Sequence, residues 1–393
     1  MHVVAAIAGL TLIVIILSDA FETVVLPRRV TRQIRFTRLF YRYSWLAWRK
    51  LVGGLRRRRR RETLLSVFGP LSLLLLFQSW AMALILGFAL LQWACGTRLH
   101  GDPTTGFGTA LYYSGTTFTT LGLGDVQPFS RWARLLTVWE AGTGFGFLAL
   151  VIGYLPVIYQ AFSRRESTIS LLDARAGSPP SAGELLRRAA EAHALHELDT
   201  LLPRFEQWAA EVLESHISYP VLTLFRSQHA NESWVAALTT ILDCCALLMV
   251  GRGAGSRSAQ LTFAMARHAV VDLAQVLNTP PQFSRPDRMP EPDWRRLQMM
   301  WPGQGRELAA GASAPSPQQA KNGLAGDPAP SPQLSELRRL YEPYVHALAD
   351  YLLLELPPWV PREGVPDNWQ TSAWERAAQR LPPPEVPLPD DHV

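Results

Sequence analysis

Three long apolar stretches limit what this chain can fold into more than any other feature of its sequence. They cover residues 3–26, 64–95 and 132–162, and each is long enough to cross a bilayer, which takes about 20 residues in a helix. A helix satisfies its own backbone hydrogen bonds inside lipid, whereas open strands and irregular loops do not. The sequence therefore predicts an all-α membrane protein, with one N-terminal span ahead of a pair of longer ones.

The basic residues indicate how these helices cross the membrane. They crowd into residues 28–62, where arginines alternate with aromatic residues and predict an amphipathic helix along the inner membrane surface. Because basic loops stay in the cytoplasm, the N-terminus is expected outside and the chain beyond Arg164 and Arg165 inside. No Lys or Arg precedes the first stretch, so residues 1–27 are expected to remain as an anchor. The net charge of +5 thus comes from basic residues that set the membrane topology. We therefore expect no nucleic acid partner.

A run of six arginines closes the amphipathic segment. At the membrane surface it would bind anionic lipid headgroups, each nearby charge contributing about 1 kcal/mol. A topology signal without any lipid partner explains the run equally well, and the sequence leaves both interpretations open. The run comprises Arg56, Arg57, Arg58, Arg59, Arg60 and Arg61.

The segment between the second and third stretches carries the most informative motif. Residues 108–119 are compatible with a short helix, and residues 120–125 read Thr-Leu-Gly-Leu-Gly-Asp. A short helix and a glycine-containing loop between two spans predict a re-entrant pore loop. Glycines at alternate positions adopt positive φ readily, so the carbonyl oxygens of such a loop are able to face one axis and replace the water around a cation.

The backbone of this loop is the predicted ion site. The Thr120 hydroxyl would add a ring of oxygens at the inner end, while Leu121 and Leu123 would point away into the packing behind the filter. The preceding helix directs the negative end of its dipole at the pore and favours a cation there. The candidate ion-binding residues are Thr120, Leu121, Gly122, Leu123 and Gly124.

Residues 119–125, Thr-Thr-Leu-Gly-Leu-Gly-Asp, resemble the Thr-Thr-Val-Gly-Tyr-Gly-Asp signature of the potassium channel family. Pro128 follows the motif at the family spacing, and Gly144 falls where the inner helix of the family commonly bends. The resemblance covers residues 64–162 and implies the two-helix pore domain of bacterial potassium channels, here within residues 63–163. It also implies K⁺ as permeant ion at positions 120–123, no cofactor, and a homotetramer in a bacterial plasma (inner) membrane. The residues expected to support the filter are Tyr112, Tyr113, Thr116, Thr117, Thr119 and Asp125.

Two departures from the family pattern leave the selectivity open. Leu123 replaces the usual aromatic residue, as in some second pore loops of two-pore-domain channels, and removes a ring that braces the filter. Thr116 stands where some bacterial members have a glutamate that contacts the filter aspartate, so that brace is absent too. The sequence predicts a potassium-selective channel and leaves two alternatives, a non-selective cation channel and a non-conducting membrane signalling scaffold. No catalytic constellation is visible, so an enzyme is not expected.

The third stretch contains a cluster of three glycines close to its one acidic residue. The glycines are expected to let the inner helix bend at a gate; a phosphate-binding loop is disfavoured because no strand precedes them. Glu140 is costly in a membrane span and suggests a function by default. It either braces the pore through Thr116 or Thr117, or senses protons during gating. The glycines are Gly142, Gly144 and Gly146.

Beyond residue 163 the composition becomes that of a soluble, helix-rich chain. Residues 233–250 are apolar enough for a fourth span, but they are few and contain Asp243, so a buried core helix is favoured. The expected parts are a cytoplasmic helical domain at 164–300, a flexible linker at 301–333, further helices at 334–380 and a disordered tail at 381–393.

No metal or nucleotide site is expected in this half. His193, His196 and Glu197 have a metal-compatible helical spacing but no further ligands, so a solvated helix face is favoured. The cysteines lack the paired spacing of a zinc site. No strand followed by a Gly-x-Gly-x-x-Gly motif is found, so the nucleotide-binding regulatory domain of many bacterial channels is not visible in the sequence. The cysteines are Cys95, Cys244 and Cys245.

Overall fold

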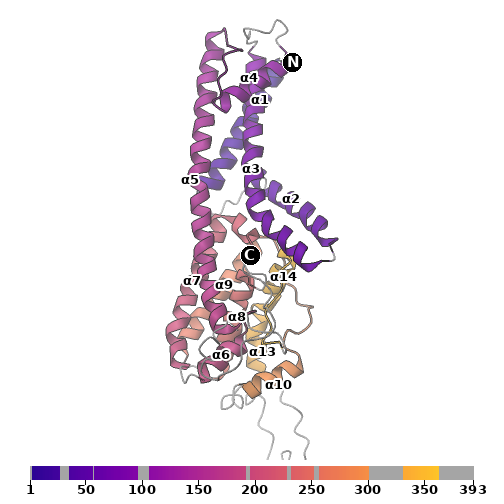
Figure 1. Cartoon of the computed structure of the whole chain (residues 1–393), viewed down its shortest axis with the longest axis vertical. Coiled ribbons are helices and arrows are strands. Elements are labelled where there is room, and N and C mark those ends of the chain that lie inside the picture. The colour runs from indigo at the N-terminus through magenta and orange to yellow at the C-terminus, as the bar shows by residue number, and fades with distance from the viewer. Residues whose placement is uncertain are drawn as a thin grey trace, which may run out of the picture. The chain divides into compact units, whose positions relative to one another are not determined.

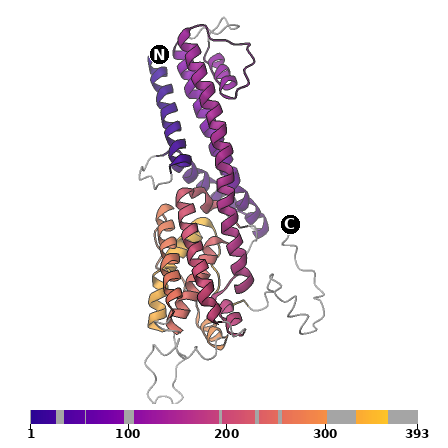
Figure 2. The ribbon, with the colours of Figure 1, turned by 90° about the vertical axis from the view of Figure 1, so that its left-hand side faces the viewer.

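A computed structural model shows the chain as helices in two compact units (Figures 1 and 2). The units are Met1–Ala161 and Phe162–Val393. Every regular element among the described residues is a helix, as the apolar periodicity predicts. The described residues are 2–26, 35–55, 57–95, 106–191, 195–227, 232–251, 256–300 and 331–362.

In the first unit, the N-terminal helix α1 (His2–Ala20) packs along α3 (Arg58–Ala94) and continues into a π-helical turn, η1 (Phe21–Val25). Gly9 and Gly87 meet at this contact. A Cβ atom at Gly9 would lie 2.6 Å from the Gly87 carbonyl oxygen, and small residues let two membrane helices approach this closely. The predicted N-terminal helix is therefore present and packed on the outer pore helix.

Asp19, near the end of α1, joins three helices. Its buried carboxylate accepts hydrogen bonds from Trp80 Nε1 of α3 (3.0 Å) and from the backbone N–H of Thr37 (3.0 Å), in the first turn of α2 (Phe36–Gly53). Arg35 Nε lies 3.7 Å from Asp19 Oδ1. A carboxylate at a helix N-terminus satisfies a free N–H group and stabilises the helix dipole. Asp19 therefore fixes where α2 begins.

The amphipathic helix α2 packs one face against α3. On that face Trp48 Nε1 donates a hydrogen bond to the Leu64 carbonyl oxygen (3.2 Å). The arginine run predicted to end this segment instead begins α3, at Arg58. Residues 27–34 and Arg56 lie outside the described residues. The opposite, exposed face carries Leu39, Tyr43 and Leu46 beside Arg38 and Arg42.

The pore loop follows α3, as predicted. The short helix α4 (Phe107–Phe118) packs beside α3 (Figure 1) and matches the pore helix expected at residues 108–119. After the loop comes α5 (Arg131–Ala176), an unbroken helix of 46 residues. The sequence predicted an inner helix that ends at residue 162. In the structure it continues 14 residues further, into the second unit.

The second unit is a bundle of helices, with α8 (Trp234–Gly251) at its core. Among the described residues, four helices are long and apolar enough to span a membrane, and α8 is one of them. Its most apolar window is 89% buried, against 33%, 50% and 17% for α1–η1, α3 and α5. The structure thus favours a buried core helix, as the sequence did. The other elements are α6 (Ala182–Glu191), η2 (Leu195–Glu197), α7 (Leu198–Ser218), η3 (Pro220–Leu224), α9 (Arg257–Val276), α10 (Glu291–Met300), α13 (Pro332–Arg339) and α14 (Glu342–Leu352).

A buried ion pair links α8 to distant parts of this unit. Both Asp243 carboxylate oxygens accept hydrogen bonds from Arg288, at 2.7 and 3.2 Å, and one also accepts the Tyr341 hydroxyl. Arg288 donates further to the Pro357 carbonyl oxygen (2.9 Å) and lies over the Trp359 ring. The segment at 331–362, expected as separate helices beyond a linker, is therefore part of the same core. Residues 301–330 and 363–393 lie outside the described residues.

The last turns of α5 are held in the second unit by Arg165. Its buried guanidinium donates to the carbonyl oxygens of Leu222 (2.9 Å) and Phe225 (2.8 Å), and its Nη1 lies 3.1 Å from His216 Nε2. Burial, and then the charge of Arg165, lower the pKa of His216 well below its usual value of 6.5. The neutral ring therefore accepts a hydrogen bond from Arg165 at Nε2. The sequence used Arg165 only as a topology signal, and the structure shows in addition that its side chain is a buried anchor.

Candidate ion-conduction site

The backbone between α4 and α5 has an unusual alternation of dihedral angles. Thr120, Gly122 and Gly124 have positive φ, at 58°, 52° and 78°, while Leu121 and Leu123 between them do not. In an ordinary strand successive carbonyl groups face opposite sides. When left-handed backbone occurs at every second residue, successive carbonyl groups turn to the same side. A cation pathway needs this arrangement.

The positive φ of Thr120 was not predicted. Left-handed backbone is common for glycine but rare for a β-branched residue, and it costs on the order of 1–3 kcal/mol. Hydrogen bonds from the loop to α4 hold this conformation. Thr120 N–H donates to the Thr117 carbonyl oxygen (3.0 Å), and Leu121 N–H donates to that of Thr116 (2.8 Å). The loop is thus tied by its N–H groups to the C-terminal end of the pore helix.

The carbonyl oxygens of the loop are left unpaired. Within the described part of the chain, those of Thr120, Leu121, Gly122 and Leu123 accept no hydrogen bond, whereas that of Gly124 accepts one from Gln127 Nε2 (3.3 Å). These residues are exposed in a single chain, so their carbonyl oxygens are free to bind water or a cation. A row of unpaired oxygens on one side of the chain fits a dehydrated cation.

A side-chain brace holds the outer end of the loop. The Tyr112 hydroxyl donates a hydrogen bond to Asp125 Oδ2 (2.8 Å), and Asp125 Oδ1 accepts one from the Val126 N–H (3.1 Å). The sequence predicted that this aspartate lacks the brace that a glutamate at Thr116 would give. That glutamate is absent, and Tyr112, one of the residues predicted to support the filter, contacts the aspartate.

Removing this brace should destabilise the conducting filter. We expect Tyr112→Phe to assemble normally but to lose current during sustained recording, because Asp125 no longer holds the outer end of the loop. Tyr43→Phe, at an exposed tyrosine of α2, is the matched control. Equal steady-state currents in the two variants, measured in planar bilayers, would show that the Tyr112 contact is not needed.

A polar cluster lies behind the pore helix, in the otherwise apolar surroundings of α3, α4 and α5. Glu140 of α5 is 0% exposed, and its Oε1 contacts the Ser114 hydroxyl of α4. The Ser114 hydroxyl also lies 2.7 Å from the Ile85 carbonyl oxygen of α3. Thr116 and Thr117 were the predicted partners of Glu140, and this prediction was wrong. The observed partner, Ser114, lies less than one helical turn before them in α4.

A second set of hydrogen bonds completes this cluster. Tyr113 Oη lies 2.8 Å from Thr137 Oγ1, and Gln92 Nε2 donates to the same oxygen (3.3 Å). Gln92, Ser114 and Thr137 were not predicted as part of the site. The sequence does contain a sign of their role, because each is a polar residue in an apolar helix and the loop brings those helices together.

Of the three α5 glycines predicted as a hinge, only Gly144 has a close neighbour in the described residues of a single chain. A Cβ atom there would overlap the Phe118 carbonyl oxygen and lie 2.9 Å from the Phe118 carbonyl carbon, whereas one at Gly142 or Gly146 would meet nothing. The helix is unbroken at all three positions. Gly144 thus provides clearance for the end of the pore helix, and a hinge at these glycines remains a prediction.

Alanine substitutions should separate these positions. We expect Gly144→Ala to impair assembly or conduction severely, because Cβ displaces Phe118, the residue just before the filter. Gly142→Ala and Gly146→Ala should leave assembly intact. Tetramer yield and ion flux for the three variants test this, and a harmless Gly144→Ala would show that α4 and α5 do not meet at this point.

A single chain leaves the outside of the loop uncovered. Leu121 is 60% and Leu123 61% exposed, so the packing predicted behind the filter does not come from the same chain. Much of α5 is also exposed. Its exposed large apolar side chains include Trp132, Leu135, Val138, Phe145, Leu148 and Ile152.

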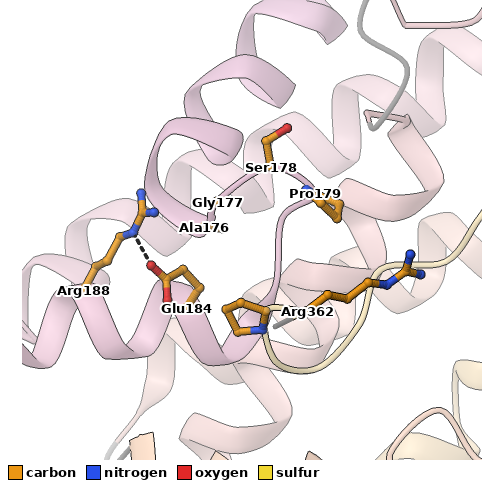
Figure 3. A pocket seen from close by; sticks show the side chains of 8 residues that line it. Ala176, Gly177, Ser178, Pro179, Glu184, Arg188 and Arg362 are labelled. Carbon is orange, nitrogen blue, oxygen red and sulfur yellow. Dashed lines mark hydrogen bonds and ion pairs between the residues drawn. The ribbon is translucent and has the colours of Figure 1, made fainter. Parts of the chain in front are cut away.

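A small pocket lies among the described residues of the second unit (Figure 3). Its volume is about 100 Å³, well below the roughly 300–1,000 Å³ of sites for organic ligands. Arg188 Nε donates to Glu184 Oε1 (2.7 Å) at its wall. The lining residues are Ala176, Gly177, Ser178, Pro179, Glu184, Arg188, Pro361 and Arg362.

The predictions about metal sites concern the same unit. The described residues contain no cluster of three or more His, Cys, Asp or Glu side chains suited to a metal ion. His193 lies outside the described residues. Cys95 is exposed, and Cys244 and Cys245 are buried.

Comparison with known proteins assigns the pore. Residues 72–160 match the family model described as "Ion channel". This part of the chain is therefore an ion channel domain with a potassium-channel-type pore, which confirms the resemblance seen in the sequence.

A curated relative extends the similarity beyond the pore. Over 269 residues the chain is 24% identical to a Bacillus subtilis (strain 168) protein called "Uncharacterized membrane protein YdjJ". The match covers 67% of this chain and 75% of that protein. Because the first unit has only 161 residues, the similarity must include part of the second. No solved structure matches the chain.

Proposed function

We propose that this protein is a potassium-selective channel that conducts K⁺ passively through the filter Thr-Leu-Gly-Leu-Gly-Asp. The observation that supports this most is the loop backbone, in which positive φ alternates along residues 120–124 and four successive carbonyl oxygens are unpaired. Carbonyl rings of this kind replace the hydration shell of a K⁺ ion. The protein's part is to hold the oxygens in place, with no covalent chemistry.

Four copies of the chain are needed to complete this pore. One chain supplies one strand of carbonyls, whereas a dehydrated ion needs oxygens on all sides. The exposed side chains of Leu121 and Leu123 also require a cover, and large exposed apolar surface marks sites of association. A homotetramer meets both requirements, because each filter loop then packs against neighbouring subunits.

Two measurements test this proposal. Native mass spectrometry in detergent should give the mass of four chains, and reversal potentials in planar bilayers should follow the K⁺ gradient and ignore the Na⁺ gradient. Equal permeability to both ions would favour the non-selective channel that Leu123 leaves open. Tetramers without any current under all conditions would favour the non-conducting scaffold.

We further propose that the second unit is cytoplasmic and modulates the pore. The inner helix α5 continues into it without a break, and Arg165 fixes that end of the helix. A domain connected in this way shifts the balance of open and closed states only by the difference in its interaction energy with the two.

Arg165→Ala should therefore change gating and spare selectivity. We expect a clear change in open probability, because the end of α5 loses its anchor, at an unchanged K⁺ to Na⁺ permeability ratio. Arg164→Ala, at the exposed neighbouring position, is the control. An altered ratio at constant open probability would show that the second unit acts on the permeation path.

The membrane surface is the proposed partner of α2 and of the start of α3. The exposed face of α2 combines apolar and basic side chains, a combination that binds anionic interfaces. In addition, arginines in the first turn of α3 oppose the helix dipole, and an anionic headgroup would offset that cost. This placement puts the N-terminus outside and fits a bacterial inner membrane.

A further inference from the structure

The Ser114 hydroxyl faces two oxygen atoms with a single proton. It lies within hydrogen-bonding distance of the Ile85 carbonyl oxygen (2.7 Å) and of Glu140 Oε1. A hydroxyl donates one hydrogen bond and accepts up to two, while a carbonyl oxygen and an ionised carboxylate only accept. If Glu140 were ionised, one of these two close contacts would join two acceptors with no hydrogen between them.

A proton on Glu140 resolves the conflict. The carboxylic acid then donates from Oε1 to Ser114 Oγ, and Ser114 donates to the Ile85 carbonyl oxygen. This chain of hydrogen bonds runs from α5 through α4 to α3. It satisfies each short contact with one hydrogen, whereas the ionised form leaves one contact repulsive.

The surroundings of the carboxyl group favour the same form. Glu140 is fully buried, and its Oε2 accepts no hydrogen bond of normal geometry from the described residues. Gln92 is the further donor that faces it. No cationic side chain of the described residues does, and a buried charge without a counter-charge is costly, most of all within a membrane.

Tyr113 is the other titratable group beside Glu140, and its proton is engaged elsewhere. Thr137 Oγ1 donates to the Ala133 carbonyl oxygen (2.8 Å), so it accepts from both Gln92 and the Tyr113 hydroxyl. Tyr113 therefore has no hydrogen to give to Glu140. The groups facing the carboxyl are then Gln92 of α3 and Tyr113 and Ser114 of α4, all neutral.

We propose that Glu140 is held as a neutral carboxylic acid and, in this form, positions the pore helix α4 between α3 and α5. Loss of the proton at alkaline pH would leave a buried negative charge and would draw the Ser114 hydrogen away from Ile85. The pore helix then loses its link to α3, and the filter that depends on α4 loses its support. The effect on current rests on the proposed channel function; the protonation state does not.

Infrared difference spectroscopy on the purified full chain tests the protonation state directly. At neutral pH, wild type minus Glu140→Gln should show a carboxylic-acid C=O band that disappears in strongly alkaline buffer. A carboxylate band in its place would overturn the proposal. This measurement needs no conduction, so it decides on Glu140 even if the channel proposal fails.

Currents test the positioning role. Glutamine keeps an N–H donor for Ser114 and cannot ionise, so Glu140→Gln should conduct at neutral pH and should lose the alkaline decline of the wild type. Ser114→Ala breaks the chain of hydrogen bonds and should reduce current at every pH. An alkaline decline that persists in Glu140→Gln would overturn the proposal, because another group would then be responsible.

Discussion

Replacing Gly122 or Gly124 by alanine is expected to abolish conduction and leave insertion and assembly intact. Both residues have positive φ, at 52° and 78°, where an L side chain is strained. The alternative, a return to negative φ, turns a carbonyl group away from its neighbours. Either way the row of oxygens is interrupted, and in the proposed tetramer one break in each chain removes a whole ring of ligands.

Thallium or potassium flux into proteoliposomes measures this effect. Flux through either variant should fall to that of empty vesicles at equal amounts of tetramer. Gly108→Ala is the matched control, because it adds the same methyl group in α4, where a Cβ atom meets nothing and φ is not positive. Wild-type flux through Gly122→Ala would remove the filter assignment.

Asp243→Ala is expected to cause the largest loss of stability in the second unit. It leaves Arg288 buried without its carboxylate and leaves the Tyr341 hydroxyl without an acceptor. Removing one partner of a buried ion pair costs about 3–5 kcal/mol. A typical domain is stable by only about 5–15 kcal/mol, so the variant should unfold at a much lower temperature or fail to accumulate.

The control for this prediction is an exposed pair in the same unit. Glu291 and Arg295 form an ion pair on the surface of α10, and exposed pairs contribute about 0–1 kcal/mol. Glu291→Gln should therefore melt close to wild type in a thermal unfolding scan of the full chain. If Asp243→Ala melted together with it, the buried pair would not be what holds residues 331–362 to α8.

The parts of this fold that depend on local pattern could be predicted from the sequence. Apolar length identified the helices that became α1, α3 and α5, and the glycine spacing located the pore loop. The interior character of α8 followed from one residue, Asp243, which is costly in lipid but satisfied by Arg288 in a helical core. In each case the signal lies within a short segment of chain.

The features that were missed depend on contacts between distant segments. Thr120 carries no sign of a positive φ, because its neighbours in α4 impose it through hydrogen bonds. Ser114 was overlooked because the register between α4 and α5 decides which hydroxyl faces Glu140. In the sequence, Arg165 fits the topology rule whether its side chain is exposed or buried. Only the packing of α7 and η3 around it shows that it is a buried anchor.

A structure of the full-length protein in a membrane mimic, determined in K⁺, tests the central claim most directly. The account predicts four chains around one axis, with ion density in line between the carbonyl oxygens of residues 120–123 and the Thr120 hydroxyls. The same preparation in Na⁺ should weaken or rearrange that density. A different number of chains, or filter carbonyls turned away from the axis with no ion density in K⁺, would contradict it.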